Sequence, residues 1–236
     1  VADPHLEPGP HDYASLRNHE GVLTFETEPF ARDLYVAGAI VADIAVSCDC
    51  RDFDLWVRLM DVHPDGRTVY VAERDDDSVA VVDLRERVVR ARVKVGTHPF
   101  ALLFDAARER LYALNVQSDD LSVVDTRTLA LVGTVPVGRA PCGAALAQDG
   151  ALLYVTNQHA DSVSVVDADS LRVLRTLTGF GYPEGIAAHG QRVYVVNWMD
   201  DDVSVLDAAS GRLLDRIATG RNSRGFGAFI GAPAPQ

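Results

Sequence analysis

The sequence has few of the residues on which disulfide, metal or cofactor chemistry usually depends. Its 236 residues include three cysteines, two methionines and two tryptophans. Three cysteines provide no disulfide framework, and Cys48 and Cys50 are interpreted as small apolar residues on one face of a strand. The sequence contains no C-x-x-C-H haem motif, no glycine-rich phosphate loop, and no histidine pair at metal spacing, since His159 and His189 stand alone. We therefore expect neither a metal nor any other cofactor.

Positive charge and long apolar runs are also scarce. The chain has 34 acidic and 22 basic residues, which gives a formal net charge of −12. Such an acidic chain repels phosphate backbones, so we expect no nucleic-acid partner. Its apolar runs are far shorter than the roughly 18 residues of a membrane-spanning helix, so we expect no membrane span. There is no G-x-S-x-G sequence either, and hence no candidate nucleophile elbow.

What the chain does contain is a four-fold internal repeat. Tyr70, Tyr112, Tyr154 and Tyr194 recur at intervals of 42, 42 and 40 residues. Each repeat carries short runs rich in valine and leucine, one of which reads SVxVVD or a close variant and closes on Asp83, Asp125, Asp167 and Asp207 in turn. About 40 residues with four short strands per repeat is typical of a propeller blade. The sequence therefore predicts an all-β fold in which residues 63–236 form a β-propeller with four visible four-stranded blades.

Acidic or polar turns separate the first two strands of every repeat. They lie at residues 75–77, 118–120, 159–161 and 200–202. The spacing of an EF-hand calcium loop is absent, so we interpret these aspartates as solvated turn formers.

The phase of the repeats leaves closure open. The chain enters the repeats on an intermediate strand (residues 68–73) and leaves on an expected innermost strand (residues 225–230). Pairing of these two segments would close a small four-bladed ring. An open arc would instead expose edges that favour a homodimer or packing by residues 1–62.

The tetrapeptide Tyr154-Val155-Thr156-Asn157 and its three variants resemble the YVTN-type β-propeller family over residues 64 to about 231. That family usually has seven blades, and its members are mostly secreted or periplasmic, which is the location that the resemblance implies. Its relatives include quinoprotein dehydrogenase subunits and propeller lactonases.

Residues 1–62 carry a different pattern of strand-like runs between acidic turns. The run GVLTFETEPFARDLYVAGAIVADIAVSCDC and its continuation resemble the start of the C-terminal jelly-roll domain of cocaine esterase-like hydrolases and X-Pro dipeptidyl-peptidases, over about residues 9–67. In that family the domain is non-catalytic and packs on a separate hydrolase body. We therefore expect residues 1–62 to form a truncated β-sandwich segment that precedes the propeller, with the change between the two patterns in the turn at residues 63–67.

Chemistry is expected at the corners that precede the innermost strands, because these corners converge on the channel of a propeller. The four corners lie at residues 96–100, 138–142, 180–184 and 220–224, and they end on Phe100, Cys142, Glu184 and Arg224 in turn. These residues differ between repeats while the strands do not, which is typical of a ligand site on a repeated scaffold. We predict ligand binding by this set together with two rim residues, His98 and Tyr182.

Glu184 and Arg224 belong to adjacent repeats and are expected to face one another. They would form either a structural ion pair or a site in which Arg224 holds a carboxylate or phosphate and Glu184 acts as base or ligand. Trp198 is either a stacking surface for a partner or a cap on the blade edge.

Three functions follow as hypotheses. The first is a non-catalytic propeller that binds a small molecule or a protein at the channel mouth. The second is a lactonase-type hydrolase that uses Glu184, His98 and Arg224. The third is an accessory-domain remnant of an X-Pro dipeptidyl-peptidase or cocaine esterase-type serine hydrolase, without catalytic activity of its own because no nucleophile, base or oxyanion hole has a candidate here.

Overall fold

The computed structural model describes residues 68–227, 229 and 230, and every regular element in this part is a strand or a single 3-10 turn. The predicted truncated sandwich at residues 1–62, including Cys48 and Cys50, lies outside the described residues. Fifteen strands form four antiparallel sheets in chain order, so the predicted all-β architecture is confirmed. Three sheets have four strands each, and the first has three strands among the described residues.

The first sheet is built from β1 (Thr68–Glu73), β2 (Ser78–Asp83) and β3 (Val88–Lys94). The second has the order β4 (Pro99–Asp105), β5 (Arg110–Asn115), β6 (Asp120–Asp125) and β7 (Ala130–Pro136). The third consists of β8 (Pro141–Ala147), β9 (Leu152–Asn157), β10 (Ser162–Asp167) and β11 (Val173–Thr178). The fourth consists of β12 (Pro183–His189), β13 (Arg192–Asn197), β14 (Asp202–Asp207) and β15 (Leu213–Ala218).

The repeated tyrosines occupy matching positions in successive sheets. Each lies in the strand that precedes the SVxVVD strand and faces the valine at the same register position: Tyr70↔Val81, Tyr112↔Val123, Tyr154↔Val165 and Tyr194↔Val205. A one-residue shift in strand pairing would move every side chain to the other face of its sheet. The same pairing in all four sheets therefore confirms the repeat.

The hydrophobic core lies between neighbouring sheets. In β5, Leu111 and Ala113 pack toward the first sheet, whereas Tyr112 and Leu114 pack toward the third. This alternation follows from the two-residue period of a strand, which puts successive side chains on opposite faces. Each interior sheet therefore contributes to two cores.

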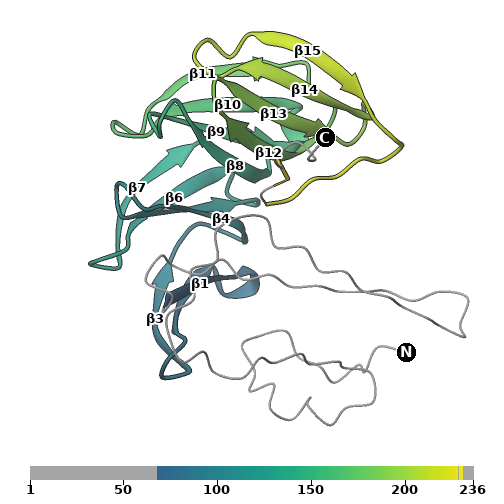
Figure 1. Cartoon of the computed structure of the whole chain (residues 1–236). Helices are drawn as coiled ribbons and strands as arrows, with labels where there is room; N and C mark the ends of the chain where they lie inside the picture. Colours follow the sequence, from purple (N-terminus) through teal and green to yellow (C-terminus); the bar gives the residue numbers. More distant parts are fainter. Residues whose placement is uncertain (1–67, 228, 231–236) are drawn as a thin grey trace, which may run out of the picture. The chain divides into compact units, whose positions relative to one another are not determined.

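The strands β4, β8 and β12 begin their sheets and lie next to one another in chain order (Figure 1). Such stacking of sheets through their first strands is the arrangement of propeller blades. Residues 225–230, expected as a further innermost strand, contain no strand among their described members. Gly227 has a left-handed φ of +65°, which interrupts the extended backbone that a strand requires.

Gly225 nevertheless follows the repeat. A Cβ on Gly185 of β12 would collide with the carbonyl oxygen of Gly225, and a Cβ on Gly143 of β8 would meet the carbonyl oxygen of Glu184 at 2.6 Å. The backbone at Gly225 therefore lies against β12 in the same way as the backbone at Glu184 lies against β8, although the segment around Gly225 forms no strand. Pairing of this segment with β1, one of the two alternatives that the sequence left open, is not among the strand pairs of the described residues.

Candidate functional site

The hairpins and corners at one end of the sheets are joined by a repeated hydrogen bond. In each repeat an aspartate in the left-handed conformation accepts the backbone N–H of a second left-handed residue 21 positions later. The four pairs are Asp77 with His98 (2.8 Å), Asp119 with Ala140 (2.9 Å), Asp161 with Tyr182 (3.0 Å) and Asp201 with Asn222 (2.7 Å). These aspartates were expected only to form turns. Their recurrence with the period of the tyrosines was the signal of the further role.

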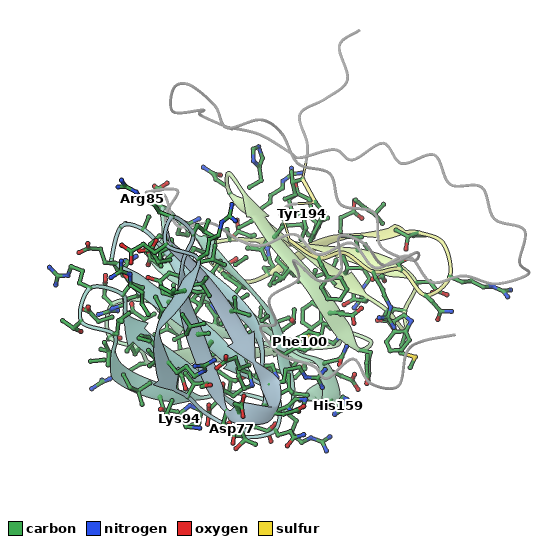
Figure 2. All side chains as sticks on the ribbon, turned by 90° about the horizontal axis from the view of Figure 1, so that it is seen from below. Asp77, Arg85, Lys94, Phe100, His159 and Tyr194 are labelled. Carbon is green, nitrogen blue, oxygen red and sulfur yellow. The ribbon has the colours of Figure 1, made fainter. Side chains whose placement is uncertain are left out.

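We call this end of the sheets the rim, meaning the hairpins at residues 74–77, 116–119, 158–161 and 198–201 with the four corners predicted from the sequence. Figure 2 shows Asp77 and His159 toward this end, whereas Arg85, from a hairpin between other strands, lies toward the opposite end. We call these four hydrogen bonds the aspartate bonds. Each one fixes the backbone of a corner to the hairpin of the preceding sheet.

A layer of buried asparagines lies directly under the rim. Asn157 donates from Nδ2 to Ser162 Oγ (3.1 Å) and Ser164 Oγ (2.9 Å), and its Oδ1 accepts the N–H of Gly138 (3.1 Å). Asn115 and Asn197 make equivalent donor contacts in their own sheets. These residues end the strand that the sequence reads as YVTN. Asn157 thereby satisfies a polar group beneath its corner, whereas the Oδ1 atoms of Asn115 and Asn197 are buried without a hydrogen-bond partner among the described residues.

Glu184 and Arg224 meet, as the sequence predicts. Arg224 Nη1 lies 3.5 Å from Glu184 Oε1, and the same oxygen accepts a hydrogen bond from Gln158 Nε2 at 3.3 Å. The Glu184 side chain is 7% exposed, and its other oxygen, Oε2, is buried with no hydrogen-bond partner among the described residues. Half of the carboxylate is therefore unsatisfied.

An aromatic group flanks this pair. The guanidinium carbon of Arg224 lies 4.3 Å from the ring centroid of Trp198, whose edge-on neighbour is Tyr182 at 5.1 Å between centroids. The Tyr182 hydroxyl lies 2.8 Å from His159 Nε2. Trp198 is thus a stacking surface, and the arginine of its own chain occupies it. His159, which stands alone in the sequence, joins the group only in the folded chain.

Two of the other predicted rim residues, His98 and Phe100, form a separate group between the first and second sheets. His98 contacts the guanidinium of Arg74 through Nε2, at 2.8 Å from Arg74 Nε, and its Nδ1 lies 3.9 Å from Asp75 Oδ1. Phe100 is 43% exposed, and the guanidinium carbon of Arg74 lies 5.9 Å from its ring centroid. No hydrogen bond or ion pair among the described residues joins His98 to Glu184 or Arg224.

Cys142 is the remaining predicted site residue, and its thiol is buried. Its Sγ lies 3.5 Å from Thr156 Oγ1 and 3.6 Å from the carbonyl oxygen of Glu184. Burial raises the pKa of the Cys142 thiol to about 11, so the thiol remains protonated near neutral pH. Among residues 68–227, 229 and 230, no three His, Cys, Asp or Glu side chains gather as a metal site would require.

The comparisons with known proteins concern two parts of the chain. The X-Pro dipeptidyl-peptidase C-terminal non-catalytic domain matches residues 3–97. The cocaine esterase of Rhodococcus sp. (strain MB1 Bresler) is 31% identical over 81 residues, which are 34% of this chain and 13% of that protein. The predicted resemblance of the first part is therefore confirmed. The match continues past Arg67, the expected end of that pattern, and includes the strands β1 to β3.

Solved structures match the repeated sheets. Hydrazine synthase of Kuenenia stuttgartiensis superposes with a TM-score of 0.61 at 27% identity, over 66% of this chain and 47% of that one. Dihydro-heme d1 dehydrogenase NirN superposes with a TM-score of 0.60 at 15% identity, over 70% of this chain and 38% of that one. A chain of the mitotic checkpoint complex gives a TM-score of 0.61 at 18% identity, over 68% and 50%. The chain spans at most half the length of these relatives, and the likenesses below 25% identity concern the fold alone.

No helix among the described residues is long and apolar enough to cross a membrane. The chain shares its fold with the solved structures named above, whereas residues 3–97 are similar to the C-terminal non-catalytic domain of X-Pro dipeptidyl-peptidases.

Proposed function

We propose that the chain is a non-catalytic module that binds a small molecule or a protein at its rim. The observation that carries this proposal is the group formed by Glu184, Arg224, Trp198, Tyr182 and His159. These side chains come from hairpins and corners of the third and fourth sheets and from the segment after β15, and they differ from their counterparts in the other repeats. The corner residue Tyr182 is held by its hydrogen bond to Asp161. A rigid scaffold with variable residues at one end is suited to binding.

The absence of an assembled catalytic set among the described residues supports a non-catalytic role. His98 belongs to the group between the first and second sheets and makes no hydrogen bond or ion pair to Glu184, so the lactonase hypothesis has no acid–base pair in contact. The Cys142 thiol is buried and protonated, which makes it a poor nucleophile.

Hydrolysis assays test this proposal. The purified full chain would be incubated with a panel of lactones, with a Gly-Pro-4-nitroanilide and with an aryl benzoate ester. We expect no turnover above a buffer control. Lactone turnover that is abolished in Glu184→Gln would overturn the non-catalytic role in favour of the lactonase, and hydrolysis of the anilide would point to peptidase activity.

An accessory role beside a hydrolase is the second candidate, and it is favoured by the match of residues 3–97 to a non-catalytic hydrolase domain. This role is compatible with rim binding, because residues 3–97 would dock on the hydrolase body while the rim binds its ligand. The full chain would then raise the thermal midpoint of a cocaine esterase-type body that lacks its own C-terminal domain. An unchanged midpoint would count against this role.

The finer assignments also belong to this proposal. We assign the four repeats to the YVTN-type propeller family on the tetrapeptide at residues 154–157 and its variants in the same register. The family resemblance suggests a periplasmic or secreted location. Size-exclusion chromatography with light scattering would show whether the chain forms the homodimer that an open arc favours.

A further inference from the structure

We propose that Glu184, Tyr182 and Trp198 form a cage for the guanidinium group of a ligand, and that Arg224 of the chain itself occupies this cage when no ligand is present. The proposal rests on the proposed function, because it assigns a ligand class to the rim. It differs from the expectation that Arg224 would hold an anion. Arg224 is here an internal competitor of the ligand.

The carboxylate of Glu184 is the first argument. Its side chain is more than nine-tenths buried, and Oε2 has no hydrogen-bond partner among the described residues. Arg224 Nη1 lies 3.5 Å from Oε1, which is longer than the roughly 2.7–2.9 Å of a charge-assisted hydrogen bond, and Arg224 makes no hydrogen bond to Oε2. A buried carboxylate oxygen without a partner is costly. A ligand guanidinium that reached both oxygens through two parallel N–H groups would remove this cost, and Arg224 does not.

The aromatic wall is the second argument. A guanidinium already stacks on Trp198 at 4.3 Å, which shows that the indole face accepts a planar cation. Tyr182 packs edge-on against the same ring and keeps it in place. A planar, delocalised cation can stack on the indole and pair with a carboxylate at the same time, whereas a compact ammonium is less suited to both contacts.

The present occupant is weakly held. The Arg224 side chain is 50% exposed and belongs to a segment that contains no strand. Its neighbour Asn222 is anchored by its own backbone bond to Asp201 and accepts a bond from Trp198 Nε1 at 3.1 Å. The wall of the cage can therefore persist when the Arg224 side chain swings away.

The charge of the surroundings favours a cation. Residues 68–236 hold 21 acidic and 17 basic residues, a net charge of −4, and each rim hairpin contains at least one aspartate. The summed negative potential attracts cationic ligands and opposes anionic ones. An anion at Arg224 would lie beside the Glu184 carboxylate and would be repelled by its negative charge.

Calorimetric titration of agmatine, a free alkylguanidinium, into the full chain and two variants tests the proposal. Arg224→Ala removes the internal competitor. Arg221→Ala is the matched control, because it removes one positive charge from the same corner and Arg221 makes no hydrogen bond or ion pair with the cage residues among the described residues. If Arg224 fills the cage about nine-tenths of the time, its removal tightens binding roughly tenfold, by the reciprocal of the competent fraction. Arg221→Ala should stay within about twofold of the wild type, since it changes only the long-range field.

The outcomes separate the possibilities. Weaker or unchanged agmatine binding in Arg224→Ala, or equal tightening in both variants, would overturn the proposal. So would binding of inorganic phosphate to the wild type that is lost in Arg224→Ala, because that result identifies an anion site. Absence of agmatine binding in all three proteins would also overturn it. In Glu184→Gln, with a far-ultraviolet spectrum and thermal midpoint close to the wild type, agmatine binding should fall at least tenfold, since charge pairing is removed.

Two further measurements identify the source of the guanidinium group and test the non-catalytic role separately from the ligand class. The capped peptide acetyl-Gly-Arg-Gly-amide would bind more tightly than agmatine if the natural ligand is an arginine side chain, and less tightly if it is a free small molecule. The same preparations would be assayed for lactone hydrolysis. Turnover would overturn the non-catalytic role and leave the ligand class to the titration, whereas failed titration without turnover would overturn the ligand class alone.

Discussion

Asp161 Oδ1 accepts the backbone N–H of Tyr182 at 3.0 Å, so the hairpin of the third sheet holds the corner that leads into the fourth. Both residues have left-handed backbones, with φ of 47° and 54°. The bond therefore positions Tyr182 for its contacts with His159 and Trp198. The same geometry recurs in every repeat, which makes the aspartate a determinant of rim structure.

Replacement of Asp161 should test this relationship. Asp161→Ala removes the acceptor and places alanine in a left-handed conformation, so we expect a loss of about 1–2 kcal/mol in the free energy of unfolding. Asp161→Asn keeps an acceptor oxygen and tolerates the conformation, and should cost less than half as much. Urea denaturation followed by circular dichroism measures both, and equal costs would contradict the role of the hydrogen bond.

The buried asparagines allow a comparison between two repeats. Asn157→Ala removes two donor contacts and leaves the Gly138 N–H without its acceptor, whereas Asn115 Oδ1 has no partner to lose among the described residues. We expect Asn157→Ala to destabilise by about 1 kcal/mol more than Asn115→Ala, which is the worth of one hydrogen bond. Chemical denaturation of the two variants gives the difference. A larger cost for Asn115→Ala would show that the layer is not organised in this way.

Two tyrosines at matching positions should respond differently to loss of the hydroxyl. Tyr154 donates to the backbone carbonyl of Ala208 at 2.9 Å and so links the third and fourth sheets, while the buried Tyr112 hydroxyl has no partner among the described residues. Tyr154→Phe should cost about 1 kcal/mol, and Tyr112→Phe should be neutral or stabilising. Thermal and urea unfolding would show the contrast. Equal destabilisation by both changes would be the contrary result.

Stability should depend on pH through the aspartates that close the SVxVVD strands. The pKa of Asp167 is lowered mainly by hydrogen bonds from the backbone and hydroxyl of Ser170, and the pKa values of Asp125 and Asp207 are lowered by similar bonds. Because the folded pKa lies below the unfolded one, the stabilisation is complete above the ordinary aspartate pKa of about 4 and is lost as pH falls through the folded pKa.

The corresponding measurement is the thermal midpoint between pH 5 and pH 2.5. Asp167→Asn retains an acceptor for Ser170 but cannot be protonated, so its midpoint should fall less steeply with acidification than that of the wild type. Asp149→Asn serves as the control, because this exposed carboxylate makes no side-chain hydrogen bond among the described residues. A slope in Asp167→Asn identical to that of the wild type would refute the assignment.

The strands and their order could be predicted because the same strand pattern occurs in four successive repeats of the sequence. Fixed spacing of Tyr112 and Tyr154 sets the register, and alternation within each strand identifies the two core faces. The corner positions of Glu184 and Arg224 followed from the same spacing, and their contact was predicted correctly. Local pattern and periodicity were enough at these places, since each strand depends only on its neighbours.

Other features depended on contacts that periodicity does not encode. His159 contributes through its contact with Tyr182, and Gln158 through a hydrogen bond to Glu184, and neither residue type is special at its position in the repeat. The segment at residues 225–230 has the apolar pattern of an innermost strand, but the left-handed backbone of Gly227 interrupts it. The aspartate at residue 161 recurs visibly in the sequence, although its partner 21 residues away could be identified only in the fold.

The packing of the sheets in successive pairs has an evolutionary consequence. Each of the three described cores joins one sheet to the next along the chain, so a repeat of about 42 residues carries one half of each of two interfaces. Gene duplication or deletion of one whole unit would leave the remaining interfaces chemically unchanged, whereas insertion of a single residue within a strand would exchange its inward and outward faces. Lineages of such chains should therefore differ in length by whole units, with new rim specificities arising in the added copies.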